Sequence, residues 1–470
     1  MMVDPVRFGA DILTASQMRA AEQQMFDAGI SVAALMERAG RGAADYVWRV
    51  AGPERTVSVL VGPGNNGGDG WVIARALLER GGRVQVVMAA PPVSDAARAM
   101  CQAYEGAVCD GADWQTMRGE VLVDCLFGTG LSRALSPAHL AMLQGLAAQH
   151  RYRIAVDLPS GVESDCGDDF GQSLPDYQMT IALGAWKRSH GLMPAVARMG
   201  DLRLVDIGCA PAVGAGRMVE GIHIAPPAAG AHKYTRGLVG MVVGDMPGAA
   251  QMAARAAAGT GAGYVQMLSD QALAVPPDLV VKPLAAWDRP DKGVTLIGPG
   301  LGRGDAARSR LADGLALCGA HPHVVDGDGL SMLTPRMTEG GPMIATPHEG
   351  ELARLERAFA LEGTGSKVER ALALARHLGA VVAKGPDTVI ASRDGRWAMV
   401  PRASAWLSVA GSGDVLAGII AGRLATMPKD PFAAACQGVW LHGRAAGLLK
   451  GPFTAMALAD AVPRAVQACL

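Results

Sequence analysis

Apolar and polar positions follow two alternating patterns along this chain. Short runs of β-branched and other apolar residues predict buried strands, and segments with apolar residues at helical spacing lie between most of them. Strands that alternate with helices form mostly parallel sheets covered on both faces, so the pattern predicts an α/β fold. The strands expected in the first half of the chain are 56–61, 83–88, 121–126, 153–158, 179–183 and 202–207.

The helices that flank these strands have recognisable starts. The first is expected near Thr14, whose spacing to Gln17 in T-A-S-Q forms a capping box, and the second spans about 32–47. A second α/β series follows, in which the last two helices run over about 412–425 and 432–448. The strands of this series are expected at 238–243, 264–268, 294–297, 323–325, 343–345 and 381–383.

A stretch rich in Pro, Gly and Ala, residues 207–237, separates the two series. At 470 residues the chain is too long for one ordinary core. We therefore expect a boundary near residues 215–222 and two domains, 1–218 and 219–470.

Composition narrows the classes of protein. Half of the residues are apolar, so a large core is available, and 43 basic against 44 acidic residues leave no basic stripe for nucleic acid. The N-terminal residues show no apolar signal segment, and no run reaches the ~18 uncharged apolar residues of a membrane helix. Eight scattered cysteines without metal-ligand spacing indicate reduced, buried thiols. These features predict a cytoplasmic protein without nucleic-acid or membrane partners.

The run G62-P-G-N-N-G-G-D-G70 joins an expected strand to an expected helix. Its glycines allow a ligand to approach the backbone, and the helix start offers free N–H groups to an anion. Asn65, Asn66 and Asp69 add polar groups beyond the needs of a phosphate. The run predicts a site for a nucleotide-like ligand, and an ordinary tight turn is the alternative.

Polar residues also follow two further expected strands, and we expect them at the same edge of the sheet. Asp124 precedes the turn F127-G-T-G130, and Asp157 and Ser160 lie in D157-L-P-S-G161. Ligands bind at the carboxyl ends of strands in such sheets, so a shared pocket is expected. Asp157 would act there as a base or as a hydrogen-bonding group, or else cap the next turn. Asn66, Asp124 and Ser160 offer oxygen ligands of low charge that suit a monovalent cation.

Lys187, in W186-K-R-S-H190, follows another expected strand. A place in the pocket and a place on the solvated surface are equally compatible with the sequence.

The second half carries a sharper signal, because G411-S-G-D414 opens an apolar helix. Free N–H groups there would hold a transferring phosphoryl group while Asp414 accepts a hydroxyl proton; a simple helix cap is the alternative. K384-G-P-D-T388 offers a cation and a hydroxyl to nucleotide phosphates. Further expected strand ends carry the turn G298-P-G-L-G302 and the polar residues Asp326, Asp328, His348 and Glu349. No Walker-type P-loop occurs.

These motifs together resemble a two-domain family that repairs hydrated nicotinamide nucleotides, an NAD(P)HX epimerase joined to an ADP-dependent NAD(P)HX dehydratase. LTASQMRAAEQ, LMERAG, GPGNNGGDG, DCLFGTGLSR and VDLPSG resemble the epimerase. HKYTRG, GPGLG, VVDGDGL, TPHEGE, KGPDT and AGSGDVLAGII resemble the dehydratase. The resemblance covers nearly the whole chain and implies a Rossmann-like three-layer α/β sandwich followed by a ribokinase-like α/β domain.

The resemblance also implies the roles of particular residues. Asp414 and Asp157 would be catalytic, and Asn66, Asp124 and Ser160 would hold a potassium ion. The epimerase substrate would contact Asn65, Asn66, Gly67, Gly68, Asp69, Gly128, Thr129, Gly130, Leu131, Ser132, Arg133, Ala134 and Asp157. The dehydratase substrate would contact Gly302, His348 and Asp414. The adenine nucleotide would contact Lys384, Gly385, Pro386, Asp387, Thr388 and Gly413.

The implied activity is the epimerisation of R- and S-NAD(P)HX and the dehydration of the S form to NAD(P)H, with ADP converted to AMP and phosphate. Potassium would serve the epimerase and Mg²⁺ the dehydratase, with NADHX and NADPHX as substrates of a homo-oligomer. The chain departs from the family pattern at Ser412, where Thr is usual, at Asp245, where a glycine is common, and in the segment around Lys187.

Two other functions fit parts of the sequence. A ribokinase-like small-molecule kinase fused to a nucleotide-binding domain would use Asp414 and its helix start equally well. It would release a stable phosphorylated product instead of free phosphate. The first half would alternatively be a non-catalytic binding module, against which the absence of a signal segment and the second nucleotide domain argue.

Overall fold

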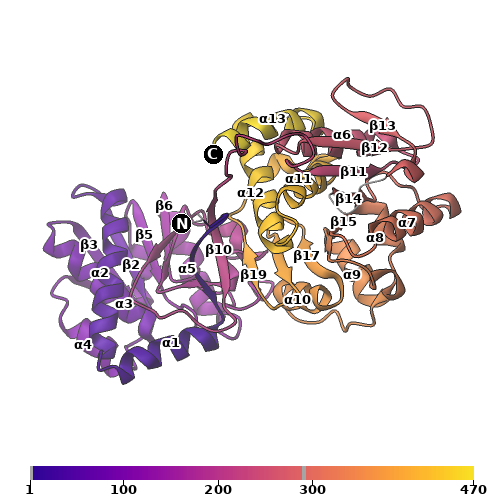
Figure 1. Cartoon of the computed structure of the whole chain (residues 1–470). Helices are drawn as coiled ribbons and strands as arrows, with labels where there is room; N and C mark the ends of the chain where they lie inside the picture. The colour runs from indigo at the N-terminus through magenta and orange to yellow at the C-terminus, as the bar shows by residue number, and fades with distance from the viewer. Residues whose placement is uncertain (1–3, 288–292) are drawn as a thin grey trace. The chain divides into compact units, whose positions relative to one another are not determined.

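The computed structural model describes residues 4–287 and 293–470 and divides into two compact units. One unit comprises Ala10–Ala215, and the other comprises Gly216–Leu470 together with Met1–Gly9 (Figure 1). The division lies three residues before the boundary expected at 218 and 219. The assignment of the first nine residues differs from the expectation, for a reason given below.

The unit Ala10–Ala215 is built on a parallel sheet with the strand order β4-β3-β2-β5-β6-β7-β9 in its described part. All six strands expected here are present within two residues, whereas the short β4 was not expected. The strands are β2 (Thr56–Val61), β3 (Arg83–Met88), β4 (Ala107–Asp110), β5 (Val121–Cys125), β6 (Tyr152–Val156), β7 (Met179–Leu183) and β9 (Asp201–Val205).

Helices cover both faces of this sheet and produce three layers. Val57 and Val59 face a core shared with the first three helices, whereas Leu60 and Leu122 face a core shared with the fifth. This alternation along the strands explains their uninterrupted apolar runs. The expected capping box of Thr14 and Gln17 opens the first helix. The helices are α1 (Ala15–Asp27), α2 (Val32–Ala51), α3 (Asn65–Glu79), α4 (Asp95–Gln102) and α5 (Pro137–Gln149).

The other unit contains the sheet order β13-β12-β11-β14-β15-β16-β17-β18-β19-β10-β1. Its strands are parallel from β13 to β17, and β18 then pairs antiparallel with both β17 and β19. The strands are β10 (Gly216–Ile222), β11 (Leu238–Val242), β12 (Tyr264–Leu268), β13 (Val280–Lys282), β14 (Gly293–Ile297), β15 (His323–Val325), β16 (Met343–Ala345), β17 (Gly379–Ala383), β18 (Val389–Ser392) and β19 (Trp397–Met399).

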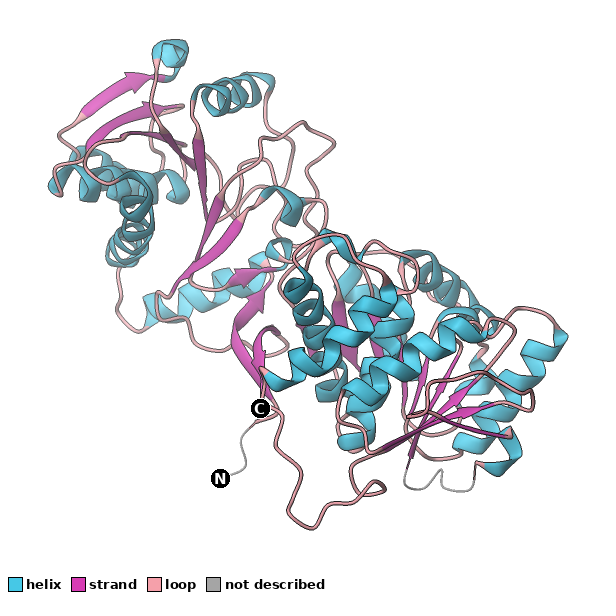
Figure 2. Ribbon diagram, turned by 90° about the horizontal axis from the view of Figure 1, so that it is seen from above, coloured by secondary structure: helices cyan, strands magenta, loops and turns pink. Residues whose placement is uncertain are grey.

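Helices also cover both faces of this second sheet (Figure 2). α11 and α12 start where expected, to within one residue, but a further helix, α13, follows them and corrects the expectation that α12 is the last. The helices are α6 (Pro247–Gly259), α7 (Asp305–Cys318), α8 (Gly327–Met332), α9 (Glu349–Ala358), α10 (Lys367–Leu378), α11 (Ser412–Thr426), α12 (Pro431–Leu449) and α13 (Ala455–Gln467).

The start of the chain explains the difference at the boundary. β1 (Val6–Leu13) lies beside β10 in the sheet order, and Val6 and Val219 share the core of the Gly216–Leu470 unit. The N–H of His223 donates to the carbonyl of Pro5 at 3.1 Å. β10 occupies part of the segment that was expected to be a linker, and its backbone hydrogen bonds hold the described start of the chain to this unit. The fold class is confirmed as two α/β units.

Within the part of the chain that the structure describes, no helix combines the length and the apolar character needed to cross a bilayer.

Candidate active sites

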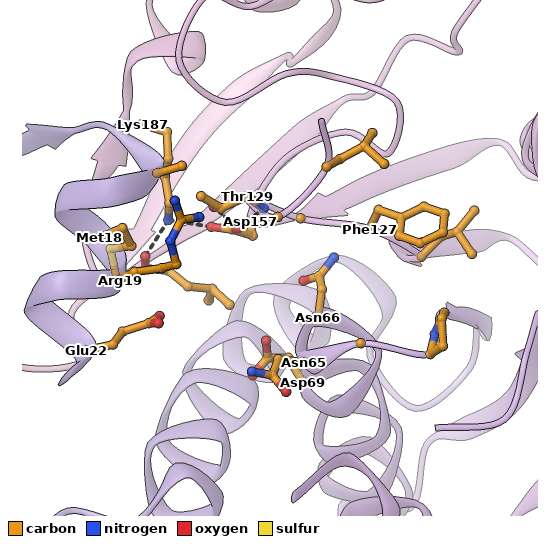
Figure 3. Close-up of a pocket in the computed structure, with 18 residues that line it drawn as sticks. Met18, Arg19, Glu22, Asn65, Asn66, Asp69, Phe127, Thr129, Asp157 and Lys187 are labelled. Atoms are coloured by element: carbon orange, nitrogen blue, oxygen red, sulfur yellow. Dashed lines mark hydrogen bonds and ion pairs between the residues drawn. The ribbon is translucent and has the colours of Figure 1, made fainter. Parts of the chain in front are cut away.

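A cavity of about 440 Å³ opens at the carboxyl ends of β2, β5, β6 and β7 in the first unit. Figure 3 shows Arg19 and Glu22 reaching into it from α1, Asn65, Asn66 and Asp69 from α3, and Asp157 and Lys187 together on another wall. The polar loops that follow three expected strands therefore meet at one cavity. Of the residues expected to bind the epimerase substrate, the cavity is lined by Asn65, Asn66, Asp69, Gly128, Thr129, Gly130, Leu131 and Asp157.

Five other residues expected at this site do not line the cavity. Ser132, Arg133 and Ala134 follow the turn that does, and Gly67 and Gly68 lie in the first turns of α3. A Cβ at Gly67 would lie 1.9 Å from the carbonyl oxygen of Gly62, and one at Gly68 would lie 2.4 Å from the sulfur of Met36. The structure therefore gives these two glycines a packing role, which the sequence reading of the loop missed.

Lys187 lies in the interior, which decides a question that the sequence left open. Its side chain is 1% exposed, and its Nζ forms an ion pair with Asp157 Oδ1. The same ammonium donates to the carbonyls of Leu183 at 2.7 Å and Ala185 at 3.2 Å. The pair thus carries the hydrogen bonds that a buried ammonium requires.

Asp157 is held from several sides. Its Oδ2 accepts from the Thr129 backbone N–H at 2.9 Å and from the Thr129 hydroxyl. His190 Nδ1 accepts from the Lys187 N–H, so its proton lies on Nε2, which donates to the Asp157 carbonyl at 2.8 Å. Burial and the Lys187 charge lower the pKa of His190 to about 4, so that this imidazole stays neutral. These contacts support the left-handed backbone of Asp157, at φ 66°.

The carboxyl groups around the cavity differ in their proton affinity. Burial alone would raise the pKa of Asp157, but the Lys187 ammonium and the Thr129 hydrogen bonds outweigh it and hold that pKa below its usual range. Burial and then the Asp157 charge raise the pKa of Asp69 well above its usual value. Burial also raises the pKa of Glu22. A carboxyl with a lowered pKa therefore lines the same cavity as one with a raised pKa, an arrangement typical of acid–base sites.

The sequence reading missed Glu22 and Arg19. Both lie on α1, and Glu22 follows Met18 by four residues, so these two residues share one face of the helix. That spacing was the available signal, because the sequence already predicted a helix from near Thr14.

The three residues expected to hold a potassium ion differ in how readily each could bind a cation. Asn66 Oδ1 is buried and has no hydrogen-bond partner among the described residues, so it offers a free acceptor. The Asp124 carboxylate is fully buried and accepts from the Ser160 N–H, the Ser160 hydroxyl, the Leu126 N–H and the Tyr177 hydroxyl. No described cationic side chain pairs with Asp124. A cation would therefore supply its missing counter-charge only by displacing one of these donors.

In the second unit, Asp414 lies in the first turn of α11, three residues after Gly411, whose φ is 89°. The first-turn N–H groups at Gly413 and Asp414 have no intrahelical partner and are available to an anion. No described donor forms a hydrogen bond or ion pair with the Asp414 carboxylate. Burial, and then the charge of Asp326, raise the pKa of Asp414 to about 6. Asp414 does not cap its own helix, which removes the simpler alternative.

A set of charged groups surrounds this helix start. Lys384 Nζ pairs with Asp326 Oδ1 at 2.7 Å and lies 3.9 Å from Glu351 Oε2. A Cβ at Gly413 would lie 3.3 Å from Lys384 Nζ, so the lysine sits against the anion-binding turn. Asp328 accepts from the Gly302 N–H at 3.0 Å, which brings the expected substrate residue Gly302 to the same cluster. Asp326 and Asp328 thus face the site, as the sequence suggested.

A cavity of about 650 Å³ adjoins the same turn. Of the residues expected to contact the substrates of this unit, it is lined by His348, Lys384, Gly385, Pro386, Thr388 and Gly413. Gly302, Asp387 and Asp414 do not line it. Asp387 Oδ1 pairs with Lys367 Nζ at 2.5 Å, because the turn directs this carboxylate toward α10. His442, which the sequence reading did not single out, lines the cavity and lies 3.2 Å from the Ser412 hydroxyl.

Comparison with known proteins matches both units. Residues 239–467 match the family model described as NAD(P)H-hydrate dehydratase, and residues 32–189 match the one described as YjeF-related protein N-terminus. The bifunctional NAD(P)H-hydrate repair enzyme Nnr of Gloeobacter violaceus is 33% identical over 95% of this chain and 94% of its own. The chain belongs to this family of bifunctional repair enzymes.

Other relatives carry the same name. The repair enzymes of Moorella thermoacetica and Coxiella burnetii are 33% and 32% identical, over 90% and 92% of this chain and 87% and 93% of their own. A crystal structure of the ADP/ATP-dependent NAD(P)H-hydrate dehydratase of Bacillus subtilis, co-crystallised with ATP and Mg²⁺, is 28% identical. It covers 53% of this chain and 95% of that one, with a TM-score of 0.45.

The two family models fall within different structural units of this repair enzyme. The YjeF-related match lies inside Ala10–Ala215, and the dehydratase match lies inside Gly216–Leu470. The dehydratase match contains every residue of the 650 Å³ cavity and Asp414. The YjeF-related match leaves out α1, which supplies Glu22 and Arg19 to the smaller cavity. Each unit therefore carries its own site.

Proposed function

We propose that the unit Ala10–Ala215 interconverts R- and S-NAD(P)HX and that the other unit dehydrates S-NAD(P)HX to NAD(P)H with ADP as phosphoryl donor. The observation that carries the proposal is the presence of two separate sites with different functional groups. The first holds two carboxyl groups that line one cavity, Asp157 with a lowered pKa and Asp69 with a raised pKa. The second holds an unpartnered carboxylate, Asp414, at a helix start suited to phosphate.

Epimerisation at C6 of the hydrated ring requires the C6–O bond to break and to form again on the other face. The ring nitrogen supplies the electron pair that expels the hydroxyl, which leaves as water when an acid protonates it. Asp69 is the acid in this proposal, because its raised pKa favours the protonated form that can give a proton. The ionised Asp157 stabilises the cationic ring, and water added to the opposite face returns the proton to Asp69. Asn65, Asn66 and the Gly128–Leu131 turn would hold the nucleotide.

A monovalent cation completes this proposal for the first site. Its support is the free acceptor at Asn66 Oδ1 and the buried charge of Asp124, which no described cation balances. Potassium, with its low charge density and flexible coordination, suits neutral oxygens better than Mg²⁺ does. The ion would hold Asn66 and the β5 and β6 ends in position, and its proposed role is structural.

In the dehydratase, the C6 hydroxyl is a poor leaving group until it is phosphorylated. Asp414 would remove the hydroxyl proton while the oxygen attacks the β-phosphorus of ADP and AMP departs. The N–H groups of Gly413 and Asp414 and the Lys384 ammonium would stabilise the charge on the transferring group. The phosphate then leaves with the electron pair of the C6–O bond, and loss of a proton from C5 restores the reduced ring.

Mg²⁺ fits this site through the nucleotide and not through a protein cage. Asp326 is occupied by Lys384 and by the Thr346 hydroxyl at 2.6 Å, and Asp328 by Gly302 and Arg303. Among the described residues, no group of three or more His, Cys, Asp or Glu side chains is placed to hold a metal ion. The ion would therefore enter with the phosphates, whose charge it neutralises.

One experiment separates this proposal from the alternatives. The protein is incubated with mixed NADHX epimers and ADP, then with ATP, while the absorbance of the reduced ring and free phosphate are followed. Regeneration of NADH with equal release of phosphate, and consumption of both epimers, are expected. A stable phosphorylated product would indicate a small-molecule kinase, and consumption of the S epimer alone would indicate that the first unit only binds nucleotides.

A further inference from the structure

A second cavity of the Gly216–Leu470 unit has no part in the proposed reactions. Its volume is about 760 Å³, and it lies between the segment 223–236 and the C-terminal ends of α6 and α11. The segment includes the end of HKYTRG, a motif of which no described residue lines the 650 Å³ cavity. None of the described residues that line the cavity is Asp or Glu.

Arg423 is the central residue of this cavity. It is 5% exposed, its Nε donates to Gln437 Oε1 at 2.8 Å, and its Nη1 donates to the Thr260 carbonyl at 3.3 Å. No described carboxylate pairs with it. A guanidinium has five N–H donors, so three of them, including both on Nη2, have no partner among the described residues. Burial lowers the pKa of Arg423 to about 10, and the side chain still carries its charge at neutral pH.

A buried charge without a counter-charge is unfavourable, and natural proteins pair such groups or use them to bind a ligand. Gln437 and Thr260 offer only neutral oxygens. The C-terminal end of α11 contributes a partial negative charge near Arg423, which offsets part of the desolvation. The unused fork of donors at Nη1 and Nη2 has the geometry that matches a carboxylate or phosphate bidentately.

Further positive and polar groups line the same cavity. Arg236, the arginine of HKYTRG, lines it and is held by a hydrogen bond from its Nη2 to the Gly261 carbonyl at 3.1 Å. His223 and Thr235 also line it. The neighbouring Lys233 is directed elsewhere, because its ammonium lies 5.0 Å and 4.9 Å from the ring centres of Tyr234 and Tyr264. The cavity thus carries two guanidinium groups and no described acidic side chain.

Much of the remaining lining is apolar, with Ile224, Met427 and Val466 among its members. We propose that this cavity is a binding site, distinct from both active sites, for a small organic anion. The ligand has a planar carboxylate or a phosphate that engages Arg423 and Arg236, and a compact apolar body that contacts the aliphatic wall. Small-molecule sites commonly combine such a wall with a few placed polar groups.

Calorimetric titration of the full-length protein tests this assignment. The probes are hexanoate for the carboxylate, phenyl phosphate for the phosphate, and hexanol as the neutral control; NAD(P)HX and adenine nucleotides are absent. We expect at least one anion to bind and to raise the melting temperature, and hexanol to do neither. The stronger of the two anions identifies the head group. If neither anion binds at concentrations up to about 10 mM, which corresponds to a very weak affinity, the proposal is overturned.

Variants assign any binding to this cavity. Loss of a charge-assisted bidentate contact weakens binding by about tenfold or more, so Arg236→Gln and Arg423→Lys are each expected to have that effect. Arg423→Lys keeps the buried positive charge, so this variant is expected to fold. The matched control is Arg255→Gln on α6, which removes an exposed guanidinium paired with Asp278 and Asp460 outside the cavity. Equal affinity in all three variants would overturn the assignment, because the anion would then bind elsewhere.

Discussion

Lys187 Nζ and Asp157 Oδ1, thirty residues apart in sequence, form an ion pair in the interior of the first unit. The pair lowers the pKa of Asp157, whereas burial, and then the charge of Asp157, raise the pKa of Asp69. The two acids line the same cavity, and their pKa values are shifted in opposite directions.

Replacement of Lys187 by Met should destabilise the first unit. The buried Asp157 carboxylate would lose its counter-charge, which costs about 3–5 kcal/mol when one partner of a buried pair is removed. The wild-type pair stabilises the fold above the ordinary pKa of an aspartate, and this contribution is lost as pH falls through the lowered pKa. In Lys187→Met, burial instead raises that pKa, so the loss of stability should be larger at pH 8 than at pH 5.

Denaturant unfolding at the two pH values measures this effect. Lys429→Met, at an exposed position of the other unit, is the matched control and should change neither curve. A Lys187 variant as stable as the wild type at pH 8 would show that the ion pair does not hold Asp157 ionised.

Asp69→Asn should slow epimerisation by about a hundredfold or more, the usual contribution of a positioned acid. The amide has nearly the same shape and cannot give its proton to the leaving hydroxyl. Conversion of R- to S-NADHX, followed by chromatography, measures the rate, and the dehydration of pure S-NADHX should be unchanged. Asp95→Asn, at an exposed carboxylate paired with Arg98, is the control. A rate for Asp69→Asn within twofold of the wild type would exclude Asp69 as the acid.

Two glycines of the same loop should respond differently to alanine. A Cβ at Gly67 would lie 1.9 Å from the Gly62 carbonyl oxygen, so Gly67→Ala forces the backbone apart and should lower the melting temperature by several degrees. A Cβ at Gly64 would meet nothing within 4 Å, and Gly64 has a negative φ and lines the cavity. Gly64→Ala should keep the melting temperature and raise the KM for NADHX. Equal thermal stability of both variants would contradict the packing role of Gly67.

Potassium should raise the melting temperature of the wild-type protein relative to tetramethylammonium at equal ionic strength. The expected cause is the added counter-charge beside Asp124 and a ligand for the free Asn66 Oδ1. Asn66→Ala should abolish the difference between the two salts, whereas Asn65→Ala should preserve it. Identical melting curves of the wild type in both salts would refute the cation site.

The strands and the convergence of the polar loops were predictable because they depend on local pattern. Apolar runs placed β2, β3 and β7 to the residue, and the rule that ligands bind at strand ends brought Asp157 and Asn66 to one cavity. The orientation of Lys187 was not predictable. It depends on the turn after β7, whose carbonyls at Leu183 and Ala185 receive the ammonium.

The segments that the sequence did not reveal acquire their structure from distant partners. The sequence of β1 resembles an ordinary polar start of the chain. The segment forms a strand because β10 lies beside it. α13 carries Pro463 within its span, which obscures the helical pattern, and its buried Leu458 and Val462 pack in a core shared with α11 and α12. Tertiary packing therefore decides both elements.

Asp414 carries the last prediction, because its pKa of about 6 affects activity and stability in opposite directions. As the proposed base it must be ionised, so dehydration should decline as pH falls below about 6. For a carboxyl whose pKa is raised by folding, ionisation opposes the folded state, so stability should fall as pH rises from its ordinary value of 3.8 through 6. Asp414→Asn should therefore abolish dehydration yet raise the melting temperature at pH 8, with little change at pH 4. Epimerisation of NADHX should continue in the same variant.

Asp460→Asn, which removes an exposed carboxylate paired with Arg255, is the control and should keep full dehydratase activity. An Asp414→Asn protein that still dehydrates S-NADHX would refute the proposed base, and one that melts lower at pH 8 would refute the unfavourable ionisation.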